Sequence, residues 1–248
     1  MEQWKGKVAI VTGASAGIGA AIAQALVHHG MVVVGLARRQ HKIQELADKL
    51  VQAQEPGKLY ALKVDLTKEE EILSAFGWVE KELGGADVLI NNAGVAYLDC
   101  IQDGKTDIWQ NTLNVNVLAF CICAREYLKS MEKRKNQHGH IVVINSVSGH
   151  MIMGCNAVYH GSKHAIAAIT QCLRRELNEK NSSIKVTDVS PGLTRSEASD
   201  RVSHLLGHHL RLEETAVAQV VVDSLATSPV TQICEVIVNP IPCNLAVY

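Results

Sequence analysis

The sequence predicts an α/β protein built on a doubly wound sheet, and two patterns in its 248 residues carry that prediction. Short runs of β-branched and aliphatic residues alternate, along the whole chain, with longer stretches of helical periodicity. The short runs are continuously apolar, which indicates strands buried on both faces of a parallel sheet. Alternation of strands and helices from end to end then places helices on both faces of that sheet.

Seven strands are expected, at residues 8–11, 32–34, 59–64, 88–90, 141–144, 186–189 and 233–238. Helices are expected at residues 18–29, 40–53, 67–83, 107–132, 157–179 and 213–226. No repeat, low-complexity tract or linker interrupts this order, so residues 1–248 are expected to form a single domain. The irregular, histidine-rich stretch 195–212 is either a substrate lid or a solvated connector.

Composition excludes several classes of function. A net charge of -1 supplies no basic field for nucleic acid or anionic membrane, and only 4% of the residues are aromatic. No apolar run approaches the ~18 residues of a membrane helix, and the first residues contain no apolar signal core. The seven cysteines are scattered without a C-x-x-C pair, so they are expected to be reduced packing residues, and no metal site is expected. The expectation is a cytoplasmic protein without nucleic-acid or membrane partners.

A turn rich in small residues follows the first predicted strand and opens the first helix, as Thr12-Gly13-Ala14-Ser15-Ala16-Gly17-Ile18-Gly19. Small residues keep such a turn tight and let phosphates approach the backbone. The helix N-terminus adds free N–H groups and the positive end of its dipole. The pattern therefore predicts a binding turn for a dinucleotide pyrophosphate, with a plain packing turn as the alternative.

Two arginines, Arg38 and Arg39, follow the second predicted strand. A site that selects NAD normally carries Asp or Glu here to bind the ribose 2′-hydroxyl, but the next acidic residue is Glu45. Guanidinium groups suit a 2′-phosphate, so the sequence favours NADP(H) over NAD(H), with Arg38 contributing more. The alternative is a solvated basic turn.

Tyr159 and Lys163 begin the helix at 157–179 and lie one turn apart on one face. A free tyrosine, with a pKa of ~10, is too weak a base at neutral pH. A neighbouring ammonium favours the phenolate, so Tyr159 could deprotonate an alcohol or donate to a carbonyl oxygen. Taken alone, the pair could also be an ordinary helix-surface pair.

Two further residues are candidates for the same site. Ser146 ends the fifth predicted strand, and its hydroxyl could donate to the same substrate oxygen, with Ser148 as the rival. Asn116 lies in the pattern at 107–132, where asparagine is a poor helix former. It could hold a water that connects Lys163 to solvent, or it could bend the helix.

These residues together resemble the short-chain dehydrogenase/reductase family. Thr12-Gly13-x-x-x-Gly17-x-Gly19 is similar to its cofactor motif, and Asn91-Asn92-Ala93-Gly94 to its N-N-A-G segment. The order and spacing of four residues match its catalytic tetrad: Asn116, Ser146, Tyr159 and Lys163. Asp65 matches the aspartate that contacts adenine, and Pro191-Gly192 the turn beneath the nicotinamide. Ser196 stands where the family usually has threonine, with Thr194 nearby.

The resemblance spans roughly residues 5–240 and implies a Rossmann-type oxidoreductase that binds NADP(H). The implied cofactor contacts are Gly13, Ser15, Ala16, Gly17, Ile18, Gly19, Arg38, Arg39, Asp65, Leu66, Asn92, Ala93, Gly94, Tyr159, Lys163, Pro191, Gly192, Leu193, Thr194 and Ser196.

Residues 5–39, 114–117 and 139–150 are similar to a narrower group, the insect NADP-dependent farnesol dehydrogenases. This similarity implies an apolar alcohol, ketone or aldehyde as substrate, held between residues 95–98, 150–153 and 195–212. The alternatives are a broad-specificity carbonyl or steroid reductase and a dinucleotide-binding regulator without catalysis.

The helical stretches at 107–132 and 157–179 carry more apolar residues than one sheet-facing stripe needs, namely Leu113, Val117, Phe120, Ile122, Ile166, Ile169 and Leu173. The family pairs these helices across a two-fold axis, so a homodimer or homotetramer is expected.

Overall fold

A computed structural model of the chain describes residues 1–97, 100–152, 154, 156–196 and 211–242. Its centre is one seven-stranded sheet in the order β3-β2-β1-β4-β5-β6-β7, and every neighbouring pair is parallel. The strands are β1 (Val8–Thr12), β2 (Val32–Ala37), β3 (Lys58–Lys63), β4 (Val88–Asn91), β5 (His140–Ile144), β6 (Lys185–Pro191) and β7 (Glu235–Val238). The predicted Rossmann-type parallel sheet is confirmed.

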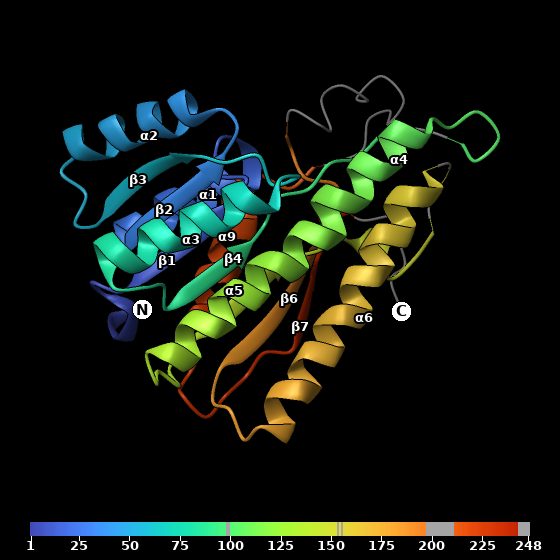
Figure 1. The fold of residues 1–248 in the computed structure, drawn as a ribbon. Coiled ribbons are helices and arrows are strands. Elements are labelled where there is room, and N and C mark those ends of the chain that lie inside the picture. The colour runs from blue at the N-terminus through green and yellow to red at the C-terminus, as the bar shows by residue number, and fades with distance from the viewer. Residues whose placement is uncertain (98–99, 153, 155, 197–210, 243–248) are drawn as a thin grey trace.

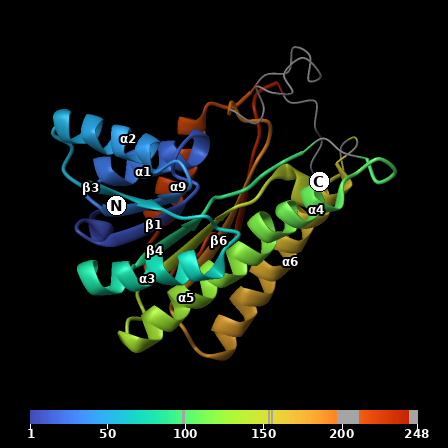
Figure 2. The same cartoon turned by 45° about the horizontal axis from the view of Figure 1, so that its top comes forward.

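Helices cover both faces of the sheet, as Figures 1 and 2 show. One face is covered by α1 (Gly17–His28), α2 (Gln40–Gln52) and α9 (Glu214–Leu225). The other is covered by α3 (Glu69–Leu83), α5 (Ala119–Lys133) and α6 (Ala157–Glu179). Each face buries its own apolar cluster, which explains why β1, β4 and β5 are buried along their whole length.

The strand order reverses beside β1, because β2 and β3 lie on one side of it and β4 to β7 on the other. Parallel strands end at the same edge of a sheet, and ligands of such folds bind outside that edge at the point of reversal. Each strand from β1 to β6 is followed by one of the candidate residues. In the order of the strands these are Gly13, Arg38, Asp65, Asn92, Ser146 and Gly192.

The helical stretch expected at 107–132 is present without a gap over residues 106–133, but it contains a π-helical turn that the sequence did not predict. The segment divides into α4 (Thr106–Leu113), a π-helical turn η2 (Asn114–Leu118) and α5. Asn116 lies inside the π turn, and its amide bonds to the backbone of Val95 instead of to its own helix. A side chain with such an outside partner competes with regular helix geometry, and π turns are frequent at functional sites.

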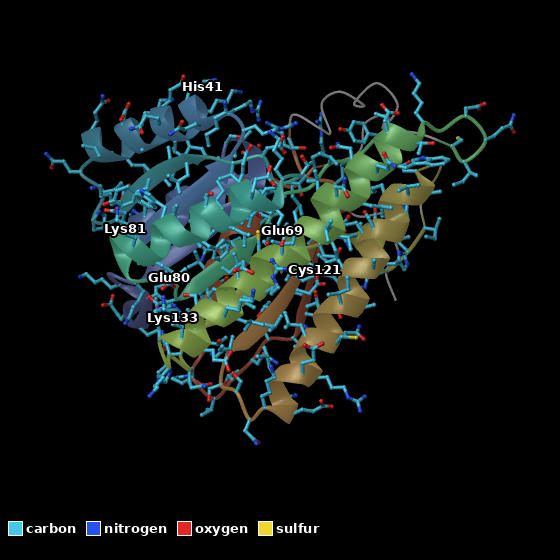
Figure 3. All side chains as sticks on the ribbon, in the orientation of Figure 1. His41, Glu69, Glu80, Lys81, Cys121 and Lys133 are labelled. Carbon is cyan, nitrogen blue, oxygen red and sulfur yellow. The ribbon has the colours of Figure 1, made fainter. Side chains whose placement is uncertain are left out.

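The outer surfaces of the helices carry charged side chains (Figure 3). Arg125 of α5 pairs with Glu69 of α3 at 2.6 Å and joins two helices on the same face of the sheet. Lys81 and Lys133, labelled in the same view, are highly exposed. None of the helices in the described part of the chain is long and apolar enough to cross a membrane.

Candidate active site

The turn after β1 approaches the loop after β4 so closely that two positions exclude a side chain. Gly13 has a positive φ of 70°, and a Cβ built on it would lie 2.9 Å from Asn92 Nδ2. A Cβ on Gly19 would overlap both the Gly13 carbonyl oxygen and the same Asn92 amide. Glycine is therefore required at both positions by the tight turn, which leaves its backbone bare at the N-terminus of α1.

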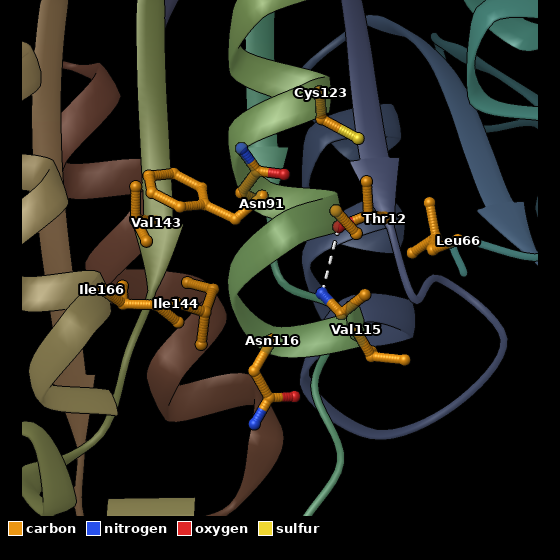
Figure 4. Close-up of a pocket in the computed structure, with 12 residues that line it drawn as sticks. Thr12, Leu66, Asn91, Val115, Asn116, Cys123, Val143, Ile144 and Ile166 are labelled. Atoms are coloured by element: carbon orange, nitrogen blue, oxygen red, sulfur yellow. Dashed lines mark hydrogen bonds between the residues drawn. The ribbon is translucent and has the colours of Figure 1, made fainter. Parts of the chain in front are cut away.

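Hydrogen bonds from Thr12 hold these two strand ends together. Its Oγ1 accepts from the backbone N–H groups of Asn92 and Ala93, both at 3.0 Å. The bond from Ala93 is dashed in Figure 4. Asn92 Nδ2 donates in return to the Thr12 carbonyl oxygen at 2.8 Å. The N-N-A-G segment is thereby placed directly beside the glycine turn.

A small pocket lies behind this junction, on the side of α5 (Figure 4). Its volume of about 10 Å³ is roughly that of one water molecule, so it is far too small for a substrate. Thr12, Leu66, Asn91 and Asn116 contribute to its wall. Asn91 Nδ2 is buried and has no hydrogen-bond partner among the residues that the structure describes.

The arginines and Asp65 meet near the outer end of the glycine turn. Arg39 is half-buried and its Nη2 donates to Ser15 Oγ at 3.4 Å, whereas Arg38 is exposed. Asp65 accepts hydrogen bonds from the backbone N–H and hydroxyl of Thr67, at 3.0 and 2.8 Å. Burial opposes these bonds, but together with the positive charge of Arg38 they hold the pKa of Asp65 below its usual value.

Ser146 lies beside Tyr159, where its hydroxyl can donate a hydrogen bond to the phenol oxygen. Burial raises the pKa of Tyr159, and the bond from Ser146 acts against that rise. Ser146 also caps the short helix η3 (Val147–Gly149), where its Oγ accepts from the backbone N–H of Ser148 at 3.1 Å. Ser148 itself is buried, and of the two serines it is Ser146 that acts on the pKa of Tyr159.

Lys163 lies one turn further along α6, with 5% of its surface exposed. Its Nζ donates to the Ile144 carbonyl oxygen at 3.1 Å and lies 6.0 Å from the centre of the Tyr159 ring. Burial lowers the pKa of Lys163 to about 8, although the charge of Asp188 acts to raise it. The lysine can therefore exchange a proton close to neutral pH.

Asn116 connects the loop after β4 with α6. Its Oδ1 accepts from the backbone N–H of Val95 at 2.8 Å, and its Nδ2 donates to the Val95 carbonyl oxygen and to Ser162 Oγ, both at 3.0 Å. The Ser162 hydroxyl then donates to the Tyr159 carbonyl oxygen at 2.7 Å. The amide thus braces the turn of α6 that carries Tyr159, while the expected water between Asn116 and Lys163 stays a prediction.

The segment after β6 returns toward the glycine turn. The Gly192 N–H donates to the Val238 carbonyl oxygen at 2.7 Å, and Thr194 Oγ1 donates to the Gly192 carbonyl oxygen at 3.0 Å. The Ser196 side chain lies 3.7 Å from a Cβ built on Gly17, so it stands beside the start of α1.

Two expected substrate segments and the lid are described only in part. Met151 is half-buried, Ile152 is exposed, and Tyr97 receives a hydrogen bond from Asn111 Nδ2 at 3.0 Å. Leu98, Met153 and residues 197–210, with the three lid histidines His204, His208 and His209, lie outside the described residues. The ends of the lid segment are paired, because Thr194 and Leu212 form a bridge. A closing lid therefore stays a prediction.

Sequence reasoning missed a second polar cluster, formed by His150, Asp188 and Glu235. Their possible metal-ligating atoms all lie within 4.8 Å of one another. The available signal was Asp188 itself, a carboxylate inside a predicted buried strand and only 2% exposed in the structure. A charge at such a position needs hydrogen-bonding partners, which the apolar pattern of the strand does not reveal.

The glycine turn yields a stability test with an internal control. Gly19→Ala should lower the free energy of unfolding, because the new Cβ overlaps the Gly13 carbonyl and the Asn92 amide. Gly77→Ala, in the open middle of α3, should instead raise it by about 0.5–1 kcal/mol. Urea unfolding of both variants measures the difference, and a neutral Gly19→Ala would contradict the close approach of the two loops.

Comparison with known proteins agrees with this geometry. The family model described as short chain dehydrogenase matches residues 7–205. A farnesol dehydrogenase from Aedes aegypti is 43% identical over 244 residues, which cover 97% of this chain and 98% of that protein. Dehydrogenase/reductase SDR family member 11 from Gallus gallus is 48% identical over 198 residues, which cover 79% of this chain and 78% of that protein.

Solved structures place the fold in the same group. A metagenomic short-chain oxidoreductase in complex with NADP aligns with a TM-score of 0.82 and 29% identity, over 96% of this chain and 98% of that one. The parallel sheet, the glycine turn beside the N-N-A-G segment and the Ser146–Tyr159–Lys163 group are all present in one chain. By its fold and by the family match over most of its length, the chain belongs to the short chain dehydrogenase family.

Proposed function

We propose that this oxidoreductase moves a hydride between NADP(H) and an apolar alcohol or carbonyl compound, with Tyr159 as the acid/base. The observation that carries the proposal is the arrangement of three side chains, in which Tyr159 lies within reach of the Ser146 hydroxyl and the buried Nζ of Lys163 lies 6.0 Å from the centre of the Tyr159 ring. A pure dinucleotide binder has no need for these three side chains together. The similar farnesol dehydrogenase from Aedes aegypti supports an alcohol as substrate.

The residues at the carboxyl edge fit a nicotinamide dinucleotide. Positions 13 and 19 have no room for a Cβ, so the turn offers bare backbone N–H groups and a helix N-terminus to a pyrophosphate. Asp65 and Leu66 would contact the adenine, and Lys163 the ribose. Pro191 and Gly192 would lie beneath the nicotinamide. When bound, the nicotinamide supplies or accepts the hydride.

Residues of the chain itself donate and accept the proton. Tyr159 donates its hydroxyl proton to a carbonyl oxygen during reduction and accepts a proton from an alcohol during oxidation. Burial raises the pKa of Tyr159 and favours the neutral phenol, and a hydrogen bond from Ser146 acts in the opposite direction. The ammonium of Lys163, 6.0 Å from the centre of the ring, would favour the phenolate when an alcohol is to be deprotonated. Ser146 orients the same substrate oxygen by a hydrogen bond.

Tyr159→Phe tests the acid/base assignment. The ring and its packing remain, but the transferable proton is lost, so kcat should fall ~100-fold or more while NADPH binding survives. Steady-state kinetics and NADPH fluorescence titration measure the two effects. Tyr60→Phe, which removes a hydroxyl from β3 beside Trp78, is the control and should keep its activity. Near-wild-type kcat in the Tyr159 variant would assign the proton transfer to another residue.

Preference for NADP(H) rests on Arg38 and Arg39, which supply positive charge beside Ser15 at the end of β2. Guanidinium forks bind phosphate oxygens well, and no acidic side chain at the end of β2 is placed for a ribose 2′-hydroxyl. The solved relative in complex with NADP supports the same choice.

Arg38→Asp should shift the ratio of kcat/KM values from NADP(H) toward NAD(H), because it removes a cation and adds a carboxylate for the 2′-hydroxyl. The Arg39→Asp variant should shift the ratio less. Arg175→Asp, an exposed change on α6, serves as the control for net charge. Equal kcat/KM values for the two cofactors in the unchanged protein would contradict the proposal.

For the substrate we propose a slot for long hydrocarbon chains. Val95 and Met151 are apolar and half-buried, on the two loops that follow β4 and β5. Arg195, a possible anion partner in the third segment, is engaged by Glu213 at 3.3 Å. A flexible methionine suits a prenyl or alkyl chain better than a rigid polar ligand.

A homologous series of primary alcohols from four to fifteen carbons tests the slot. Each buried methylene contributes up to ~0.8 kcal/mol, so kcat/KM should rise by as much as about fourfold per carbon until the slot is full. Sugars and charged acids, assayed in parallel, should be poor substrates. A flat profile would rule out the apolar slot and leave the acid/base assignment intact, and a preference for ketosteroids would identify a steroid reductase.

We further propose that the subunit assembles as a dimer or tetramer. Of the apolar residues expected at the interface, Phe120, Ile122, Ile166 and Leu173 lie in the core of the subunit. Of the others, Val117 and Ile169 are half-buried and Leu113 of α4 is 46% exposed. Leu118, which was not expected there, adds a second exposed apolar side chain in η2, with 54% of its surface exposed. These helices run beside α6 in Figures 1 and 2, so a second subunit could cover both.

A further inference from the structure

Asp188 lies in the middle of β6 and is almost completely buried. Its Oδ2 accepts a hydrogen bond from Asn145 Nδ2 at 3.0 Å, and its Oδ1 accepts one from the Ser190 hydroxyl at 2.8 Å. Asn145 directly precedes Ser146, and Ser190 directly precedes the Pro191–Gly192 turn. One carboxylate therefore connects the segment that carries the serine with the turn proposed to lie beneath the nicotinamide.

The network continues outward to β7. His150 Nε2 lies 2.9 Å from Ser190 Oγ and 3.0 Å from Glu235 Oε1. Glu235 is the direct neighbour of Asp188 in the register of β6 and β7. A continuous polar chain thus runs from the buried carboxylate to a partly exposed one, through a histidine on the loop after β5.

Asp188 lies in the strand next to the one that holds Lys163, because Lys163 Nζ donates to the carbonyl oxygen of Ile144, which pairs in register with Val189, the residue after Asp188. Burial and the charge of Glu235 raise the pKa of Asp188, while the bonds from Ser190 and Asn145 and the charge of His150 lower it. Its negative charge raises the pKa of Lys163 against the larger effect of burial. Among the described residues Asp188 makes no ion pair within 4 Å, so it acts on the lysine through space.

We propose that Asp188 is a positioning residue, which holds the Ser146 segment and the Pro191–Gly192 turn in register and supplies a negative charge on the strand beside the one whose Ile144 carbonyl binds Lys163. This inference rests on the proposed function. Each oxygen of Asp188 accepts a hydrogen bond, one from Asn145 and one from Ser190, so the carboxylate is fixed between the two segments. A fixed second layer of this kind is what holds reacting groups within the narrow tolerance that catalysis needs.

Asp188→Asn removes the charge and keeps the shape of the side chain, because its amide oxygen can accept from Asn145 and its NH2 group can donate to Ser190 Oγ once that hydroxyl turns away. Carbonyl reduction needs protons on both Tyr159 and Lys163. Removing a negative charge lowers the pKa of an ammonium and of a phenol alike. The alkaline limb of the pH profile of kcat with NADPH should therefore move to lower pH in this variant. Glu235→Gln removes a more exposed charge and should move the limb less.

Ser190→Ala isolates the positioning, because it breaks the link to the turn and leaves the charge in place. Its kcat should fall by about tenfold to a hundredfold, the scale of a small misplacement of reacting groups, while its alkaline limb stays where it is in the unchanged protein. An unshifted limb in Asp188→Asn would overturn the electrostatic part of the proposal. Normal kcat in Ser190→Ala would overturn the positioning part, even if the Asp188 variant failed to fold.

The order of measurements separates this inference from the proposed function. The unchanged protein is assayed first with NADPH and a panel of apolar ketones and aldehydes, together with Tyr159→Phe. No turnover on the panel, or full activity of the tyrosine variant, would contradict the proposed function and with it this inference. The proposed function would stand if turnover depends on Tyr159. The inference about Asp188 alone would be contradicted if the alkaline limb of Asp188→Asn stays unshifted and Ser190→Ala keeps full activity.

Discussion

The contact between the ends of β1 and β4 is the constraint on which the rest of the site depends. The Thr12 hydroxyl bonds to two successive N–H groups of the N-N-A-G segment, and Asn92 returns a bond to Thr12. This contact lies where the strand order reverses, and it brings a bare glycine turn beside a loop that Asn116 ties to α6. The cofactor turn and the helix that carries Tyr159 are thereby joined.

Burial, more than direct pairing, sets the electrostatics of the candidate site. It lowers the pKa of Lys163 to about 8 and raises the pKa values of Tyr159 and Asp188. All three shifts move toward the neutral form, since a low-dielectric interior disfavours charge. Hydrogen bonds from Ser146, Asn145 and Ser190 act in the opposite direction. Of the three groups, Lys163 is the one whose pKa is brought nearest to neutral pH.

The fold was largely predictable because each strand of a parallel sheet that is buried on both faces appears in the sequence as a short uninterrupted apolar run. All seven runs became strands, although the last was shorter, at Glu235–Val238, because β7 is an edge strand with alternating exposure. The helix at 107–132 was less predictable. Its π-helical turn at Asn116 depends on hydrogen bonds to Val95 and Ser162, which are distant in sequence. Helical periodicity contains no information about such partners.

The sequence by itself determined the family, the parallel sheet and the set of residues at its carboxyl edge, because apolar patterns and motif spacing depend only on the order of residues along the chain. Only the tertiary structure decided which of these residues touch. It placed the Ser146 hydroxyl within reach of Tyr159 and buried Ser148, and it packed most of the apolar side chains of α5 and α6 into the core of the subunit. It also brought His150 and Glu235 to the buried Asp188. Contacts across neighbouring strands depend on register, which is set by the packing of the whole sheet.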